Sequence, residues 1–442
     1  MSGADAGRNG AADHYVIIGG GLAAARAAEG MRAAGFTGAV SIVAGEDEHP
    51  YIRPPLSKEY LSGSAERASI FVHDEAWYAD HDVRVLRGRT AVAITLAEQS
   101  VSLDDGDVLQ YDKLLIASGA RSRRYPGPGA ELDGVHHLRT VGESEALAAA
   151  LAPGGKRVVI IGSGWIGLEV ASAARGYGNA VTVLGRESVP LENVVGREIG
   201  GVFDALHRAN GVDLRNATGV SGIESGIESG IEGGIEGGGD RAGVVAGVRL
   251  SGGELLPADV VVVGIGALPN VELAEAAGLA LDNGILVDEG FRSSHPGVFA
   301  VGDVANVFHP VLGSHLRVEH WATAKDAGFA AGEAMAGLPI SYEQIPYFYT
   351  DQFDLGMEYS GYGIWAADAE LVVRGSLAER EFIAFWLRDG RVVAGMNVNV
   401  WDVNETVQAL IRSAVPVHAA RLTDPAVPLD SLLGPQPNGA AQ

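Results

Sequence analysis

The chain of 442 residues contains no cysteine. This absence excludes disulfide bonds, thiolate ligation of an iron–sulfur cluster, a C-x-x-C redox pair and a thiol nucleophile. Any redox chemistry must therefore come from a bound cofactor.

Long apolar runs and basic residues are also scarce. No uninterrupted apolar run approaches the roughly 18 to 20 residues of a membrane-spanning helix. Residues 1–13 lack the apolar region of a signal peptide, so we expect a flexible tail and a cytoplasmic protein. With 32 basic and 56 acidic residues the formal charge is −24. This charge argues against nonspecific binding to nucleic acid and against adhesion to anionic membranes.

Residues 15–29 combine an apolar strand, a glycine turn and a helix of small residues. Gly19, Gly21 and Ala24 stand at the three positions of G-x-G-x-x-G/A. The first position permits a tight turn, the second lets a pyrophosphate approach the backbone, and the third lets the helix pack on the strand. Glu46 follows the next predicted strand, where it can accept the ribose hydroxyls. A glycine turn alone can also be an ordinary loop.

A second module of the same kind begins at residue 156. Its strand leads into a complete G-x-G-x-x-G at Gly162, Gly164 and Gly167, which opens a helix. A dehydrogenase with one coenzyme needs one such site, whereas hydride transfer from nicotinamide to flavin needs two. The sequence therefore favours a flavoprotein.

The coenzyme preference stays open at the end of the second strand of this module. NADH enzymes commonly carry an acid there, which bonds the adenosine ribose and repels a 2′-phosphate. In this chain the position is Gly185, followed by Arg186 and Glu187. Arg186 can accept the phosphate of NADPH, and Glu187 can still bind the ribose of NADH.

Three other segments have local signals. We expect Arg53 to be extended because it precedes proline, and Ser57 to cap a short helix that carries Lys58. Residues 83–103 suggest a small antiparallel excursion. A fourfold Gly-Ile-Glu repeat at residues 222–237 suits neither a stable helix nor a repeat domain, so we expect a flexible or loosely paired hairpin.

The run Arg-Pro-Pro-Leu-Ser-Lys at residues 53–58, beside a flavin-type turn, resembles the FAD-dependent NAD(P)H:ferredoxin and rubredoxin reductases of bacterial oxygenase systems, which are related to apoptosis-inducing factor. The resemblance implies an α/β fold with two Rossmann-like, glutathione-reductase-like dinucleotide-binding domains and a small α+β C-terminal domain. The implied domains are an FAD domain (14–122 and 267–337), an NAD(P)H domain (123–266), a C-terminal domain (338–433) and flexible ends (1–13 and 434–442).

The resemblance also implies the roles of individual residues. Lys58 and Glu169 would pair beside the flavin, and Trp321 would lie near its ring and mediate contact with the acceptor. Helix 322–337 would point its positive end at the flavin. The implied FAD residues are Gly19, Gly21, Leu22, Ala23, Ala24, Glu46, Arg53, Lys58, Ala117, Ser118, Gly119, Arg121, Gly302, Asp303 and Trp321. The implied NAD(P)H residues are Gly162, Gly164, Trp165, Ile166, Gly167, Glu169, Arg186, Glu187, Gly264, Ile265 and Gly266, and no metal site is implied.

Each of these roles has a plainer alternative. Lys58 can be a solvated lysine, Trp321 a core tryptophan, and the pair Gly302 and Asp303 an ordinary turn after a strand. The aromatic-Thr-Asp-Gln-aromatic segment at residues 349–353 resembles the opening of the C-terminal domain of the same reductases.

The implied activity is hydride transfer from NADH or NADPH to FAD, followed by single-electron transfer to a ferredoxin-type iron–sulfur protein that feeds a monooxygenase or dioxygenase. A homodimer is a further expectation. Docking of an acidic partner would need a local basic face, and the candidates are Arg123, Arg124, Arg317 and Arg412. An NAD(P)H oxidase or diaphorase, and a redox-controlled binding protein like apoptosis-inducing factor, remain alternatives. Disulfide reductases of this fold are disfavoured because cysteine is absent.

Overall fold

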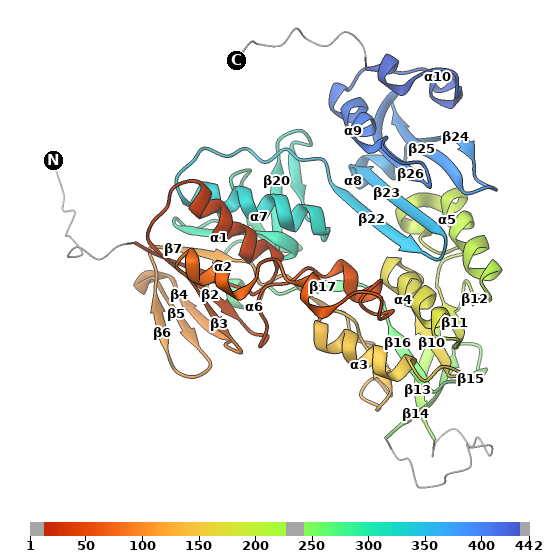
Figure 1. Cartoon of the computed structure of the whole chain (residues 1–442), viewed down its shortest axis with the longest axis horizontal. Coiled ribbons are helices and arrows are strands. Elements are labelled where there is room, and N and C mark those ends of the chain that lie inside the picture. Colours follow the sequence, from red (N-terminus) through yellow and green to blue (C-terminus); the bar gives the residue numbers. More distant parts are fainter. Residues whose placement is uncertain (1–12, 227–242, 434–442) are drawn as a thin grey trace, which may run out of the picture. The chain divides into compact units, whose positions relative to one another are not determined.

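Two parallel sheets organise the chain, and each belongs to a separate unit of the computed structural model, which describes residues 13–226 and 243–433 (Figure 1). The first unit comprises Met1–Ile52, Arg67–Arg121 and Leu268–Gln344, and the second comprises Arg53–Glu66, Ser122–Ala267 and Ile345–Gln442. Two of the boundaries between the units fall inside strands. One lies within β8 (Ala120–Ser122) and the other within β17 (Ala267–Pro269).

The sheet of the first unit has five parallel strands in the order β19-β7-β1-β2-β3. Its apolar runs are continuous because both faces are covered. Tyr15 and Ile17 lie in the core on one face, and Val16 and Ile18 lie in the core on the other. The strands are β1 (His14–Ile18), β2 (Ala39–Ala44), β3 (Val83–Arg87), β7 (Lys113–Ile116) and β19 (Val298–Ala300).

Small residues let two helices approach closely on one face of this sheet. Helix α1 (Leu22–Ala33) packs against α7 (Trp321–Met335), and Figure 1 shows them side by side. A Cβ on Gly332 would lie 2.1 Å from the carbonyl oxygen of Ala27. The backbones therefore touch where a larger residue would separate the helices.

The other elements of the first unit are short. An antiparallel sheet β4-β5-β6 contributes to the core on the second face of the parallel sheet. A small sheet has the order β18-β20-β21. The bounds are α2 (Glu75–Asp80), β4 (Ala91–Thr95), β5 (Ser100–Leu103), β6 (Val108–Gln110), α6 (Glu272–Ala276), β18 (Ile285–Val287), β20 (Ala305–His309) and β21 (Ser314–Leu316).

The second unit repeats the parallel sheet in the order β12-β11-β10-β16-β9 and adds an antiparallel sheet β13-β14-β15. The strands are β9 (Val135–His136), β10 (Arg157–Ile161), β11 (Ala180–Leu184), β12 (Asp213–Arg215), β13 (Val220–Ser225), β14 (Val245–Leu250), β15 (Leu255–Pro257) and β16 (Val260–Val263). The helices are α3 (Val141–Leu151), α4 (Trp165–Gly176) and α5 (Glu192–Ala209).

The C-terminal part of the second unit is an antiparallel sheet of order β22-β23-β26-β25-β24 with helices α8 to α10. Helix α9 packs on β26 and β23 of this sheet. The bounds are β22 (Tyr347–Gln352), β23 (Leu355–Gly361), α8 (Gly363–Ala366), β24 (Glu370–Ser376), β25 (Glu381–Arg388), β26 (Arg391–Val398), α9 (Asn404–Ser413) and α10 (Ala419–Thr423).

Several local expectations need correction. Residues 83–87 do not belong to an antiparallel excursion, because they form β3, which pairs in parallel with β2. In this part of the chain the antiparallel strands are β4, β5 and β6. Arg53 is helical rather than extended, with φ −92° and ψ −26°, and its guanidinium donates a hydrogen bond to the carbonyl oxygen of Arg139. Ser57 caps no helix: it ends a 3-10 turn, Pro54–Ser57, and Lys58 follows that turn. The prolines set the backbone of the turn, and the hydroxyl of Ser57 is used elsewhere.

The Gly-Ile-Glu repeat is described only at its beginning. Residues 222–225 lie in β13, which pairs antiparallel with β14. The remaining predicted hairpin residues from 227 onward, and the predicted flexible ends at 1–12 and 434–442, lie outside the described residues. Within the described part, no helix is both long and apolar enough to cross a membrane.

A buried histidine joins α5 to the C-terminal sheet within the second unit. His207 is fully buried, and its Nε2 lies 2.9 Å from Oε1 of Gln352 on β22, so Nε2 carries the proton. Its ring meets Phe353 edge-on, with centroids 5.1 Å apart. Burial lowers the pKa of His207, and the hydrogen bond with Gln352 opposes this shift without cancelling it.

We predict that Gly332→Ala lowers the thermal midpoint. The added Cβ meets the Ala27 backbone, and overpacking of this kind costs roughly 1–3 kcal/mol. Circular dichroism melting checks this, with Gly201→Ala as control, because no atom lies within 4 Å of a Cβ on Gly201 in α5. The control should match or slightly exceed wild type. Equal midpoints for the two variants would contradict the packing.

We also predict acid sensitivity from His207. Because its folded pKa lies below the unfolded value of about 6.5, stability is present above that pH and is lost as the pH falls toward the folded pKa. His207→Gln should be less stable at pH 7.5 but lose less stability between pH 7.5 and 5.5. Melting curves across this range test it, with the exposed His418 replaced by Gln as control. Parallel pH profiles for His207→Gln and wild type would count against the assignment.

Candidate functional site

The first glycine turn joins β1 to α1 in the first unit. Gly19 has a φ of +120°, and a Cβ there would lie 2.1 Å from the carbonyl oxygen of Ala117, so only glycine fits. Gly21 precedes α1, and no atom lies within 4 Å of a Cβ built on it. Ala24 is fully buried in the following helix, where only a small residue packs. The open position at the start of the helix is where a pyrophosphate would meet the backbone.

Other predicted FAD segments of the first unit converge on this turn. The end of β7 reaches it through the approach of Ala117 to Gly19. The end of β19 reaches it through Gly302, because a Cβ there would lie 3.2 Å from Cβ of Ala23 in the first turn of α1. Asp303 follows directly and is 9% exposed. The turn, the end of β7 and the end of β19 therefore form one cluster.

An asparagine that the sequence reasoning missed holds the segment after β7. Ser118 Oγ donates to the carbonyl oxygen of Asn270 at 2.8 Å, and Asn270 Nδ2 donates to the carbonyl oxygen of Ser118 at 2.8 Å. The backbone N–H of Asn270 donates to Gly119. Arg121 donates to Asn270 Oδ1 and forms an ion pair with Glu272 at 2.6 Å. In the sequence, only the position of Asn270 shortly after the apolar run at residues 260–263 hinted at this role.

The acid after β2 is positioned by a tyrosine. Tyr51 donates its hydroxyl hydrogen bond to Glu46 Oε2 at 2.5 Å. The backbone oxygen of Glu46 accepts from Gly88, which follows β3. These contacts hold the predicted ribose-binding carboxylate at the carboxyl end of the parallel sheet, which is where ligands of such sheets bind.

The N-terminus of α7 carries His320 and Trp321. Burial lowers the pKa of His320 to about 4, against the opposing charge of Asp303, so the imidazole is neutral at pH 7. Lys325 lies one turn further on, with Nζ 5.2 Å from the centroid of the Trp321 ring. This brings Trp321 into contact with a cation of its own helix.

The second glycine turn has the same geometry in the second unit. Gly162 has a φ of +116°, and a Cβ there would lie 2.2 Å from the carbonyl oxygen of Gly264. No atom lies within 4 Å of a Cβ on Gly164, which precedes α4. A Cβ on Gly167 would lie 2.1 Å from the carbonyl oxygen of Gly162. The predicted residues Gly264 and Ile265 therefore lie beside the turn.

The side chains on the first turn of α4 differ in exposure. Trp165 packs edge-on to Phe203 and to Phe348, with centroids 5.4 Å and 5.1 Å apart, so its ring belongs to the packing of the unit. Ile166 is 43% exposed. Trp165 is half-buried against these two rings, whereas Ile166 exposes its side chain.

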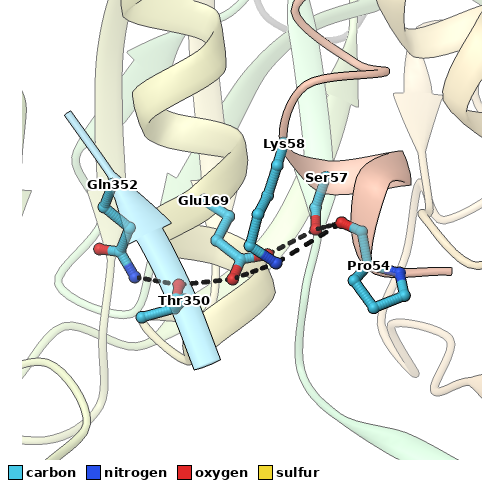
Figure 2. A network of polar contacts seen from close by, with 6 residues as sticks. All are labelled: Pro54, Ser57, Lys58, Glu169, Thr350 and Gln352. Carbon is cyan, nitrogen blue, oxygen red and sulfur yellow. Dashed lines mark hydrogen bonds and ion pairs between the residues drawn. The ribbon is translucent and has the colours of Figure 1, made fainter. Parts of the chain in front are cut away.

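A buried carboxylate is the centre of the polar network in Figure 2. Glu169 on α4 is 6% exposed, and its Oε1 lies 3.1 Å from Nζ of Lys58. Ser57 donates to Oε2 at 2.5 Å, and Thr350 on β22 donates to Oε1 at 2.5 Å. Two hydroxyls and one ammonium group therefore face one carboxylate. The predicted pair of Lys58 and Glu169 is present, and its charges are compensated within the unit.

The network continues in one direction away from Glu169. Gln352 Nε2 donates to Thr350 Oγ1 at 3.2 Å, and His207 donates to Gln352. Lys58 Nζ also lies 3.5 Å from the carbonyl oxygen of Pro54 and 5.0 Å from the centroid of the Tyr349 ring. The sequence did not identify the partners in this network, which are Ser57, Thr350, Gln352 and His207. All but His207 lie inside the segments that carried the resemblance, residues 53–58 and 349–353.

The predicted FAD residues are divided between the two units. Arg53 and Lys58 belong to the second unit, whereas the other predicted FAD residues belong to the first. Among the docking candidates, Arg317 is unsuitable, because its side chain is only 13% exposed and forms an ion pair with Glu319. Arg124 lies 2.8 Å from His137. No group of His, Cys, Asp or Glu able to hold a metal ion occurs in residues 13–226 or 243–433.

Both turns fit a dinucleotide by their own geometry. In each turn a nearby carbonyl oxygen leaves no room for a Cβ at the first glycine. The second glycine leaves open the space that a side chain would fill. Residues on the neighbouring strands lie beside the same opening. The arrangement suits two coenzymes, one in each unit, each with phosphates at the N-terminus of a helix.

Comparison with known proteins gives the same result over nearly the whole chain. Residues 13–328 match the model of the family described as pyridine nucleotide-disulphide oxidoreductase, and residues 347–433 match that of the reductase C-terminal domain. The ferredoxin–NAD(+) reductase component of an anthranilate 1,2-dioxygenase system from Burkholderia cepacia is 38% identical, over 96% of this chain and 100% of that protein. Putidaredoxin reductase from Pseudomonas putida is 35% identical, over 95% and 97%.

A solved structure matches equally well. The covalent putidaredoxin reductase–putidaredoxin complex contains a chain that superposes with a TM-score of 0.88 at 34% identity, over 96% of this chain and 98% of that one. The α/β flavoprotein fold with an antiparallel C-terminal domain is therefore shown. The chain belongs to the pyridine nucleotide-disulphide oxidoreductase family and, within it, to the ferredoxin reductases of oxygenase systems.

Proposed function

We propose that the chain holds FAD at the first glycine turn, takes hydride from NAD(P)H bound at the second, and passes single electrons to a ferredoxin-type iron–sulfur protein. The enzyme class is an oxidoreductase of the ferredoxin–NAD(P)+ reductase type. The acceptor would in turn feed a monooxygenase or dioxygenase. Cytoplasmic location and a homodimer are further expectations.

The observation that carries this proposal is the pair of open glycine turns in a chain without cysteine. Two turns provide for two dinucleotides, which hydride transfer from nicotinamide to flavin requires. The family description names disulfide chemistry, but no thiol exists here to receive electrons. The electrons must therefore leave to an external acceptor, as the names of the curated relatives state for those proteins.

Bound FAD would accept two electrons together and release them one at a time. The residues of the chain bind the coenzymes, orient them and shield them from water. The turns hold phosphates, Glu46 and Asp303 offer carboxylates to hydroxyl groups, and the positive end of α7 favours negative charge nearby. Glu169, held by Ser57 and Thr350, keeps Lys58 in one position.

Anaerobic titration of the purified protein with NADH and NADPH tests the proposal, followed by addition of a ferredoxin. We expect a yellow protein that bleaches on coenzyme addition and reduces ferredoxin faster than oxygen. Preferential reduction of oxygen or quinones would indicate an oxidase or diaphorase instead. Slow turnover with a coenzyme-dependent change in oligomeric state would indicate a redox-controlled binding protein. A colourless protein without recoverable flavin would overturn the assignment.

We predict that Lys58→Ala slows flavin reduction by about ten- to a hundredfold while FAD stays bound, because a charge-assisted contact of about 1.5–3 kcal/mol is lost beside Glu169. Stopped-flow absorbance measures the reduction rate, and the flavin spectrum measures occupancy. Lys156→Ala is the matched control, since that lysine belongs to the same unit and directly precedes β10.

Glu169→Gln provides a second arm of the same experiment. Because Lys58 and Glu169 interact directly, the double variant should be slowed less than the sum of the two single effects. A reduction rate equal to wild type in Lys58→Ala would remove the lysine from the mechanism.

A further inference from the structure

The end of β11 has a serine hydroxyl where an acidic residue would begin. A Cβ built on Gly185 would lie 2.5 Å from Oγ and 3.0 Å from Cβ of Ser163. Real Cβ atoms essentially never approach another atom within 3.0 Å, so an acid at this position requires Ser163 to move. Ser163 is the middle residue of the second glycine turn, between Gly162 and Gly164. The side chain of Ser163, which is 5% exposed, therefore lies beside Gly185, and this position carries no carboxylate such as NADH enzymes commonly have there.

The residue after Gly185 is a cation, Arg186. Arg186 is exposed, and across residues 13–226 and 243–433 it makes no hydrogen bond or ion pair. Because it follows Gly185 directly, its backbone lies at the same end of β11 as Ser163. A guanidinium without such contacts can bind an anion without first breaking another interaction.

The nearby acids, in contrast, already have partners. Glu187 Oε1 accepts a hydrogen bond from Asn193 Nδ2 at 3.0 Å. Glu192 accepts from the backbone and the hydroxyl of Ser188, at 2.8 Å and 2.7 Å, and forms an ion pair with Arg197. These contacts hold the pKa of Glu192 low, at about 2. Glu187 and Glu192 thus differ from Arg186, because both acids already accept hydrogen bonds.

We propose that Ser163 and Arg186 form a subsite for the 2′-phosphate of NADPH, so that the enzyme uses NADPH in preference to NADH. This rests on the proposed binding of a nicotinamide coenzyme at the second glycine turn. The arginine supplies a charge-assisted contact to the phosphate, and the serine supplies a hydroxyl donor without repelling it. No carboxylate at Gly185 competes for the ribose hydroxyls.

Ligand binding tests the subsite without turnover. Calorimetry of the FAD-loaded protein with 2′,5′-ADP and with 5′-AMP compares two ligands that differ only in the 2′-phosphate. We expect 2′,5′-ADP to bind at least tenfold more tightly, and Arg186→Ala to remove most of that difference. Arg388→Ala is the control, because Arg388 is an exposed arginine on β25 of the same unit. Equal affinities in wild type would overturn the proposal.

Kinetics with paired substitutions give a second readout. The ratio of kcat/KM for NADPH to that for NADH should exceed one in wild type and fall at least tenfold in Arg186→Ala. Gly185→Glu alone would clash with Ser163, so it is combined with Ser163→Gly, which opens the space. The double variant should shift the ratio toward NADH.

The two proposals fail in different ways. A protein that holds no flavin, or is reduced by neither coenzyme, refutes the proposed function. A flavoprotein that is reduced faster by NADH and does not distinguish the two adenylates refutes only the subsite. Loss of expression of the double variant leaves the calorimetry of Arg186→Ala to decide.

Discussion

At both glycine turns a carbonyl oxygen occupies the space where a side chain would begin. In the first unit the oxygen belongs to Ala117 and excludes a Cβ from Gly19; in the second it belongs to Gly264 and excludes a Cβ from Gly162. Each contact brings the end of a neighbouring parallel strand against the turn, so the residues that follow that strand face the same opening. The candidate coenzyme sites depend on this close approach, because any larger residue would separate the strand end from the helix N-terminus.

The second organising feature is the carboxylate of Glu169. An isolated buried charge is costly, and this one is compensated by an ammonium and two hydroxyl groups from segments distant in sequence. The network joins the 3-10 turn at Pro54–Ser57, helix α4 and strand β22 inside one unit. Its extension through Gln352 reaches His207, whose neutral imidazole suits a fully buried site. Packing of the C-terminal sheet and positioning of Lys58 are therefore parts of one structure.

The absence of cysteine connects the fold to the direction of electron flow. Residues 13–328 match a family whose description names disulfide chemistry, and this chain has two glycine turns but no thiol. In the subsite that we propose, specificity for the electron donor depends on small features at the end of β11. A serine hydroxyl beside Gly185, a guanidinium one residue on that has no partner among the described residues, and nearby acids that already accept hydrogen bonds would favour a doubly charged phosphate over a bare ribose.

The sequence by itself determined what local chemistry can encode: the two glycine turns, the strand that precedes Glu46 and the helix after Trp321 were predicted, because apolar periodicity and glycine spacing are local properties. The tertiary structure decided the rest. It paired β3 in parallel with β2, made Arg53 helical although it precedes proline, and turned Ser57 toward Glu169 instead of a helix end. Each of these outcomes depends on a partner far away in the chain, and distant partners leave no local signal.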